Sequence, residues 1–293
     1  MSWLSIRFQE KFAAVAVCFR EKKIKIVRIV GTHSFSTMLI DTHAHICDPS
    51  FDPDRQAVLE RAATAGIDAV IGVGENLADA ERNLALADRY PMIWPAAGLY
   101  PTVLDMDQAE DMQAFIRRER SRLIAIGEVG LDFWMVKEEF GRAIQKKIFK
   151  SFIELSKELD LPLNVHSRSA GKHAIKQLLE SDARRVQLHA FDGKASAAMP
   201  AVEAGFFFSV PPSVVRSRQK QKLVKQLPMA SLLVETDSPV LGPDPKIRNE
   251  PANLAVSVNA IAEIKHFSQE AVMSAISDNA QRLYNYKEIK LCE

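Results

Sequence analysis

Short apolar runs alternate with amphipathic helical stretches from residue 38 onward, and this alternation limits the folds open to the chain. Eight of the runs are predicted to be strands, at 38–42, 68–73, 92–98, 123–128, 161–166, 185–189, 205–210 and 232–237. Strands separated by helices lie parallel and are joined by right-handed crossovers. Eight such units predict an α/β fold, a (β/α)8 TIM barrel, as a single domain over residues 38–293.

Helical stretches fill the gaps between these strands. Helices are predicted at 55–65, 76–89, 107–120, 138–159 and 214–227, two more end near 180 and 203, and terminal helices lie within 253–286. Asp52 followed by Pro53 is typical of a helix start, and Gly66 ends that helix. A long loop rich in Pro and Gly, 238–251, follows the eighth strand.

The composition is that of an ordinary globular protein. The chain has 293 residues, 47% hydrophobic and 26% charged, with a net charge of +1, so no global polycation is available to hold long nucleic acid. Its three cysteines, Cys18, Cys47 and Cys292, are few and widely spaced, which favours a reducing compartment, cytoplasmic or nuclear. No apolar run is long enough for a membrane helix.

The first 37 residues differ from the rest. They hold seven Lys and Arg residues against Glu10 and Glu21, a basic and acid-poor balance that a mitochondrial presequence would share. They lack the Ser and Arg bias and the amphipathic period of such a presequence, and their apolar run at 12–19 is short. We therefore expect 1–37 to be a poorly packed appendage or the product of an upstream start codon, with no part in the chemistry.

Metal-binding residue types stand where the predicted strands end. The active sites of such barrels are built at the C-terminal ends of the strands. His43 and His45 share one face of an extended chain because residues two apart point the same way. Four further strands end at Glu128, His166, His189 and Asp237. One such histidine would be an ordinary core residue, but six converging ligand types predict a metal site.

Six motifs together resemble the TatD family of metal-dependent deoxyribonucleases, within the amidohydrolase superfamily. They are DTHAH at 41–45, GEVGLD at 127–132, NVHSR at 164–168, LHAFDG at 188–193, ETDSP at 235–239 and RNEP at 248–251. The match runs in order from residue 38 to about 284, and 1–37 lies outside it.

The resemblance implies a site with two divalent ions. His43, His45 and Asp237 would hold one ion, His166 and His189 the other, and Glu128 would bridge them. A single-ion site, with His166 and His189 as core residues, is the alternative. Histidine-rich donors favour Zn²⁺ or Mn²⁺ over Mg²⁺. The family usually carries a histidine where this chain has Tyr100, which can hydrogen-bond a phosphate but is not a cation.

Supporting and substrate-binding roles follow for neighbouring residues. Asp237 is also a candidate to accept the proton of the attacking water, with a purely structural ligand as the alternative, and Glu128 is the other catalytic candidate. Asp41, Asp132 and Glu235 are expected to support the ligands from behind. Substrate contacts are predicted for three rim residues: Arg168, Tyr100 and Phe191. Arg168 could instead be a solvated loop residue. Phe191 could instead be a core residue, as Phe207 and Phe208 are expected to be.

Two further features allow two interpretations each. The basic residues Arg216, Arg218, Lys220, Lys222 and Lys225 either follow a nucleic-acid backbone or form a solvated helix face. The loop 249–251 either closes a wall of the site or caps the barrel.

The sequence thus predicts a metal-dependent hydrolase acting on ester bonds, with DNA or another phosphodiester as its substrate, cut from an end. An amide or ester hydrolase, such as an aminoacyl-tRNA deacylase, is one alternative, because barrel and ligands alone do not fix the substrate. A non-enzymatic, metal-bound scaffold is another. No membrane association and no obligate protein partner are predicted.

Overall fold

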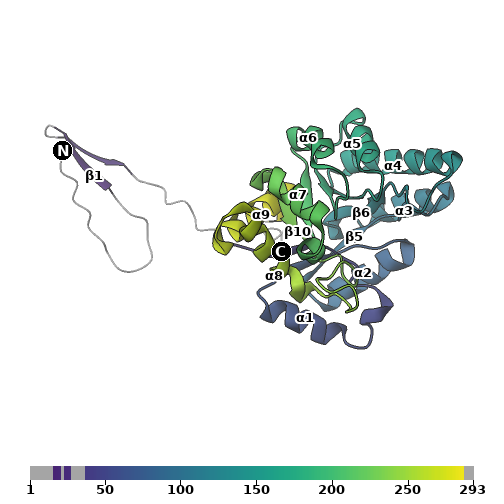
Figure 1. Cartoon of the computed structure of the whole chain (residues 1–293), viewed down its shortest axis with the longest axis horizontal. Coiled ribbons are helices and arrows are strands. Elements are labelled where there is room, and N and C mark those ends of the chain that lie inside the picture. Colours follow the sequence, from purple (N-terminus) through teal and green to yellow (C-terminus); the bar gives the residue numbers. More distant parts are fainter. Residues whose placement is uncertain (1–15, 21–22, 28–36, 287–293) are drawn as a thin grey trace. The chain divides into compact units, whose positions relative to one another are not determined.

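The computed structural model describes residues 16–20, 23–27 and 37–286, in two units that divide between Ser36 and Thr37 (Figure 1). In the first unit, β1 (Ala16–Arg20) pairs antiparallel with β2 (Lys23–Val27). The apolar run noted at 12–19 lies partly outside the described residues. The division falls one residue before the predicted domain start, and the assignment of 1–37 as an appendage stays a prediction.

The second unit contains a sheet of eight strands that pair in sequence order, each parallel to the next. They are β3 (Ile40–Ala44), β4 (Ala69–Gly72), β5 (Ile93–Ala97), β6 (Ala125–Gly130), β7 (Leu163–His166), β8 (Val186–Leu188), β9 (Phe207–Val210) and β10 (Leu232–Val234). The predicted parallel barrel is confirmed.

Helices alternate with these strands. They are α1 (Arg55–Thr64), α2 (Leu77–Arg89), α3 (Met106–Arg118), α4 (Glu139–Leu159), α5 (Gly171–Glu180), α6 (Ala195–Glu203), α7 (Arg218–Gln226), α8 (Leu254–Lys265) and α9 (Gln269–Tyr284). The prediction of one helix over 214–227 is wrong at its start. A 3₁₀ turn occupies Pro212–Val215, and Ser217 then caps α7 by accepting a hydrogen bond from the Lys220 amide.

The two outermost strands, β3 and β10, meet and bring the barrel close to closure. Thr42 Oγ1 donates to the Val234 carbonyl at 2.8 Å. Beyond β10, the Asp237 amide donates to the His43 carbonyl at 2.9 Å. The first and last ligand-bearing segments are therefore joined backbone to backbone at the rim.

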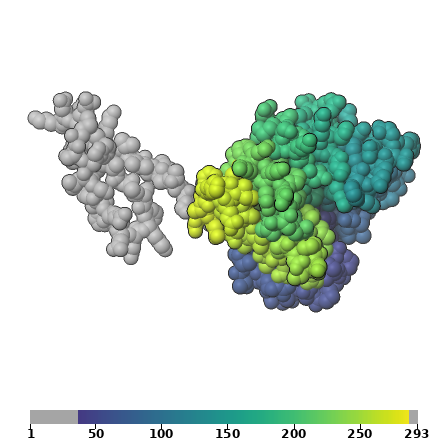
Figure 2. All heavy atoms as spheres, viewed as in Figure 1, coloured from purple at the N-terminus to yellow at the C-terminus, as the bar shows by residue number. Residues whose placement is uncertain are grey.

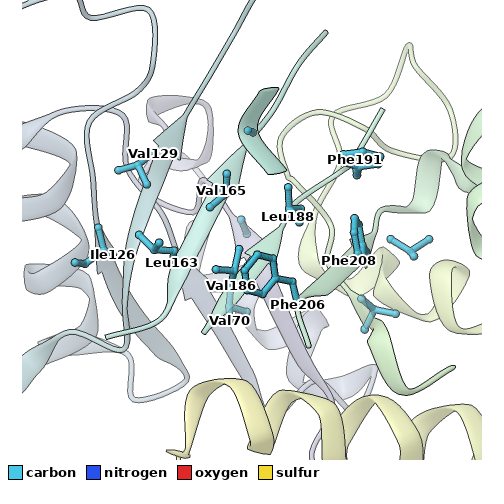
Figure 3. Close-up of a cluster of buried hydrophobic side chains, with 14 of the residues drawn as sticks. Val70, Ile126, Val129, Leu163, Val165, Val186, Leu188, Phe191, Phe206 and Phe208 are labelled. Carbon is cyan, nitrogen blue, oxygen red and sulfur yellow. The ribbon is translucent and has the colours of Figure 1, made fainter. Parts of the chain in front are cut away.

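Alternating residues along each strand face opposite sides of the barrel wall. On β7, Leu163 and Val165 belong to the large apolar layer between strands and helices, which Figure 3 shows together with Val186 and Leu188 of β8. Asn164, between them in sequence, instead contacts His43 inside the barrel. On β7 the alternation thus aims Asn164 at the barrel interior and the two apolar residues at the helices.

The C-terminal helices complete the second unit. The buried Tyr284 hydroxyl of α9 donates to Gln187 Oε1 at 2.5 Å, which joins the helix to the interior of the barrel. Lys265 of α8 donates to backbone carbonyls of Lys225 and Leu227, and Figure 2 shows the yellow helices in contact with the green surface of this region. Within the described ranges, no helix has the length and apolarity of a membrane span.

Candidate metal centre

The six predicted ligand residues converge at the C-terminal rim of the barrel. Glu128, on β6, lies between two groups of them. The β3 side comprises His43, His45 and Asp237, and the β7 side comprises His166 and His189. Three sets of possible ligand atoms among the described residues each lie within 4.8 Å of one another. His43, His45 and Glu128 form one, Glu128, His166 and His189 form the second, and His43, His189 and Glu235 form the third.

The two carboxylate oxygens of Glu128 face different sides. Oε1 lies 2.6 Å from His166 Nδ1 and 2.7 Å from His189 Nε2. Oε2 lies 3.3 Å from His45 Nε2 and 3.8 Å from His43 Nε2, and it has no hydrogen-bond partner within the described chain. A buried anionic oxygen without a partner is costly. A cation between it and the two imidazoles would satisfy it, so these residues fit a metal.

Asp237 completes the β3 side. Its Oδ1 lies 3.5 Å from His43 Nε2 and 3.6 Å from His45 Nε2. The residue has a left-handed backbone, φ +53°, which aspartate tolerates better than most side chains. This turn ends β10 at Val234, three residues earlier than predicted, and brings the carboxylate to the histidines.

Strands β6 and β7 must come unusually close for Glu128 to reach His166. At Gly130, φ is +149°, and a Cβ atom there would collide with the His166 carbonyl oxygen. The adjacent Leu131 amide donates to that same carbonyl at 3.0 Å. Glycine is required here by backbone conformation and by space.

Asn164 orients His43 from inside the barrel. Its Nδ2 donates to the Thr42 carbonyl at 2.9 Å, which leaves Oδ1 to accept from His43 Nδ1 at 2.8 Å. In its neutral form, His43 therefore carries its proton on Nδ1, which leaves the Nε2 lone pair for the β3 side.

Asp132 plays the corresponding part for His166. Its Oδ2 lies 3.1 Å from His166 Nε2, while its Oδ1 accepts from the Trp134 and Met135 amides. With Nε2 as the donor to a carboxylate, His166 Nδ1 is the nitrogen free to face Glu128. Gln145 of α4 holds the Asp132 amide in turn, at 3.0 Å.

The other two predicted supporting carboxylates touch backbone and hydroxyl groups. Asp41 accepts from the Thr236 amide at 2.8 Å and from its hydroxyl at 2.5 Å, so it positions the segment that carries Asp237. Glu235 accepts from the Ala190 amide at 2.7 Å and from Ser209 Oγ at 2.5 Å, next to His189. Each is buried, and burial raises the pKa of Asp41 to about 7 and that of Glu235 to about 8.

Charge coupling dominates the electrostatics of the histidines. Burial alone would lower the pKa of His43, but the carboxylates of Asp237 and Glu128 outweigh it and raise the pKa to about 10. The pKa of His166 rises to about 9 in the same way, beside Glu128 and Asp132. His189 is the exception, since burial and the nearby His43 lower its pKa to about 4.

The RNEP segment braces the Asp237 loop from outside the pocket. Asn249 Nδ2 donates to the Thr236 and Val240 carbonyls, both at 2.8 Å. Arg61 of α1 forms an ion pair with Glu250, with Nη2 2.6 Å from Oε2, which fixes the segment to the barrel. The prediction that 249–251 forms a wall of the site is wrong, because Pro239, Val240 and Leu241 line the pocket on that side and 249–251 does not.

A pocket of about 740 Å³ opens above the ligands, and its walls differ in charge. Asp48, Glu75 and Asp79 line it near His45. Arg168 and Lys220 line it near His166 and His189, together with Asp192. Tyr100 also lines it, edge-on to His166, and burial raises the pKa of its hydroxyl well above the usual value, so the hydroxyl stays protonated.

One substrate-contact prediction needs correction, and the basic run near α7 enters the pocket at one residue. The Phe191 ring is 1% exposed and packs edge-on against Phe208, so it presents no face to a base, and the core interpretation is correct. The basic residues near α7 other than Lys220 are exposed outside the pocket, and the choice between a nucleic-acid contact and a solvated helix face stays a prediction. Lys220 alone of the five lines the pocket, with its ammonium donating to the Ala190 carbonyl at 2.8 Å.

Sequence reasoning gave no individual role to two residues of this site. Asn164 lies two positions before His166 on one strand, so the period of two would have placed it on the same face. Lys220 belongs to a run of similar cations, and nothing in that run distinguishes it.

Comparison with known proteins agrees with this architecture. Residues 40–285 match the family described as TatD related DNase. The human deoxyribonuclease TATDN3 is 44% identical over 266 residues, which cover 84% of this chain and 94% of that protein. The Bacillus subtilis protein YabD, described as an uncharacterised metal-dependent hydrolase, is 33% identical, with 84% and 99% covered.

Among solved structures, the Escherichia coli TatD homologue YjjV superposes with a TM-score of 0.78 at 29% identity, covering 84% of this chain and 98% of that one. The sequence-based resemblance is therefore confirmed: the chain belongs to the TatD-related DNase family and is a metal-dependent hydrolase.

Proposed function

We propose that this chain hydrolyses phosphodiester bonds of DNA from a strand end, using two divalent ions bridged by Glu128. The observation that carries the proposal is the division of the Glu128 carboxylate, with one oxygen toward each group of histidines. In this assignment His43, His45 and Asp237 hold one ion, and His166 and His189 hold the other. The imidazole-rich donors favour Zn²⁺ or Mn²⁺ over Mg²⁺.

Two bound dications supply an activated water near neutral pH and offset the negative charge of the phosphate. The chain's own residues do the rest. His43 holds the pKa of Asp237 below its usual value despite burial, and Asp237 would accept a proton from the attacking water. Asn164 and Asp132 hold the two histidine tautomers fixed throughout.

Polar side chains of the pocket position the phosphodiester. The Tyr100 hydroxyl, protonated at working pH, donates to a phosphate oxygen. Arg168 and Lys220 attract the strand to their side of the pocket, and the acidic wall opposite keeps the phosphate from settling there. The human relative named a deoxyribonuclease supports DNA over other phosphodiesters.

The test is a cleavage assay with end-labelled DNA. The purified chain is loaded with Mn²⁺ or Zn²⁺ and incubated with single-stranded oligonucleotides labelled at either end, beside an aminoacyl-tRNA. Stepwise release of mononucleotides from one end is expected, and it should vanish in Asp237→Asn. Release of internal fragments would contradict the exonucleolytic part. Turnover of the aminoacyl-tRNA alone would replace phosphodiesterase by deacylase activity.

We also propose that residues 38–293 form the whole catalytic domain. The barrel start is tied internally, since the Leu39 amide donates to Asp68 Oδ2 at 2.7 Å and the Met38 amide to Ser277 Oγ at 3.0 Å. A chain lacking 1–37 should keep its kcat/KM within about twofold of the full chain. A larger loss would give the appendage a part in the reaction.

A further inference from the structure

An exposed indole lies just outside the metal pocket. Trp134, in the loop between β6 and α4, is 57% exposed, and the Arg168 guanidinium lies 5.3 Å from its ring centroid. Arg168 itself lines the pocket. A cation thus connects the metal-bearing cavity to an aromatic surface, an arrangement that suits a polyanion carrying flat bases.

The loop that carries Trp134 is fixed to the metal centre. Asp132 accepts from the Trp134 amide at 2.9 Å with one oxygen, while its other oxygen contacts His166. The Phe133 amide donates to the Arg168 carbonyl at 3.0 Å, and Arg142 donates to the Phe133 and Val136 carbonyls. The indole is therefore exposed on a braced backbone at a set place relative to the ligands.

Charge and continuity favour a nucleic acid over a protein as the occupant. The surface begins at the basic wall of the pocket, where the proposed function places a phosphodiester. Stacking on an aromatic ring is tolerant of base identity, because every base has a π-face, and it requires an unpaired base.

Resting on the proposed function, we propose that Trp134, backed by Arg168, stacks against an unpaired base of the substrate strand beside the phosphate held in the pocket. Trp134 is then a specificity-determining residue that favours strands carrying a base at that position. Arg168 serves both parts of the strand, since it lines the phosphate pocket and holds the indole.

The experiment measures binding apart from cleavage. Anisotropy of a labelled single-stranded oligonucleotide is followed with the full chain, with Trp134→Ala and with Trp134→Phe, in the presence of a chelator so that nothing is cut. The control is Phe267→Ala, an aromatic side chain of similar exposure (52%) outside the pocket. A second strand has the same backbone but propanediol spacers in place of nucleosides.

Trp134→Ala should weaken binding of the normal strand about tenfold, and Trp134→Phe by less, since a smaller ring still stacks. Binding of the base-free strand should change equally little in every variant. Unchanged affinity of Trp134→Ala for the normal strand would overturn the proposal, as would an equal loss for the base-free strand. If Trp134→Ala bound the normal strand unchanged, a protein partner would become the better explanation of the exposed indole.

The outcome is independent of catalysis. If the Mn²⁺- or Zn²⁺-loaded chain cuts no DNA, the proposed function fails, while the anisotropy series still decides whether Trp134 binds a base. If the chain cuts DNA and Trp134→Ala binds and cuts it as the full chain does, only the stacking proposal fails.

Discussion

The two sides of Glu128 use the same residue types in different states. On the β7 side, both histidines lie within hydrogen-bonding distance of Oε1, at 2.6 and 2.7 Å. On the β3 side, Oε2 has no hydrogen-bond partner among the residues that the structure describes, and its nearest imidazole nitrogen is 3.3 Å away. On the β7 side, Glu128 therefore has hydrogen-bonding contacts with both histidines, whereas on the β3 side it has none as short.

The difference extends to the groups behind the ligands. A neutral amide, Asn164, orients His43, but a carboxylate, Asp132, orients His166. A carboxylate makes an imidazole a stronger base and hence a better ligand. The β3 side instead has the extra ligand charge of Asp237. We infer that an ion entering the β7 side must replace the short contacts between Glu128 and its two histidines, whereas on the β3 side Glu128 makes no such short contact.

Glu128→Gln should have the largest effect, because it removes the one charge that both sides share. We expect kcat to fall by about a thousandfold and bound metal to fall from two ions to at most one. Metal analysis of the purified variant and an oligonucleotide assay measure the two losses.

Glu235→Gln is the matched control. Glu235 is equally buried, but its hydrogen bonds go to the Ala190 amide and Ser209, and its nearest histidine nitrogen, His189 Nδ1, is 3.9 Å away. Because burial raises its pKa to about 8, it carries little charge at neutral pH, and a neutral glutamine should cost less than about tenfold. Equal losses in both variants would show that Glu128 does not bridge.

The placement of these six residues was predictable from the sequence, but their pairing was not. The period of two puts His43 and His45 on one face, and the barrel brings distant strand ends to one rim. The turn at Asp237, the division of the Glu128 oxygens and the close approach at Gly130 depend on backbone torsions that the strand pattern does not encode. Trp134 and Lys220 come from a loop and a helix face, where apolar periodicity carries no information about the pocket.

Asp132→Asn should have the next largest effect. Asparagine would keep Oδ1 for the Trp134 and Met135 amides and turn its NH₂ group toward His166. Nε2 would then accept rather than donate, which moves the proton to Nδ1 and removes the lone pair that faces Glu128. Metal affinity of the β7 side should fall by about a hundredfold.

Asn164→Ala tests the β3 side in the same way. It removes the acceptor of His43 Nδ1 without forcing the other tautomer, so the loss should be nearer tenfold. Zinc titrations against a competing chelator compare the two variants. The comparison of the two sides would fail if the alanine variant lost more affinity than the asparagine variant.

The pH dependence of metal binding should differ between the two sides, because their histidines carry different numbers of protons. The pKa values of His43 and His45 are both raised, whereas on the β7 side that of His166 is raised and that of His189 is lowered. At pH 6.5, groups with raised pKa are mostly protonated, and an ion must expel those protons. Affinity should therefore fall as pH falls, more steeply for the β3 side.

Calorimetry in buffers of different ionisation enthalpy counts the protons released. Two variants that each leave one side intact, His189→Asn and His45→Asn, separate the contributions. The variant that keeps the β3 histidines should release more protons per bound ion than the one that keeps the β7 histidines. The reverse order would mean that the charges of Asp237 and Glu128 do not raise the pKa values of His43 and His45.

The smallest effects are expected in the pocket walls, where the contrast continues above the ligands. Lys220→Met keeps the apolar stem but removes the cation on the β7 side, and it should raise the KM for an oligonucleotide about tenfold while kcat changes little. Glu75→Gln removes a carboxylate near His45 and should lower KM by about twofold. Raising the salt concentration should shrink both shifts, since screening weakens each wall. If the two variants moved KM in the same direction, the strand would not lie nearer the basic wall, and the asymmetry would belong to the metal ligands alone.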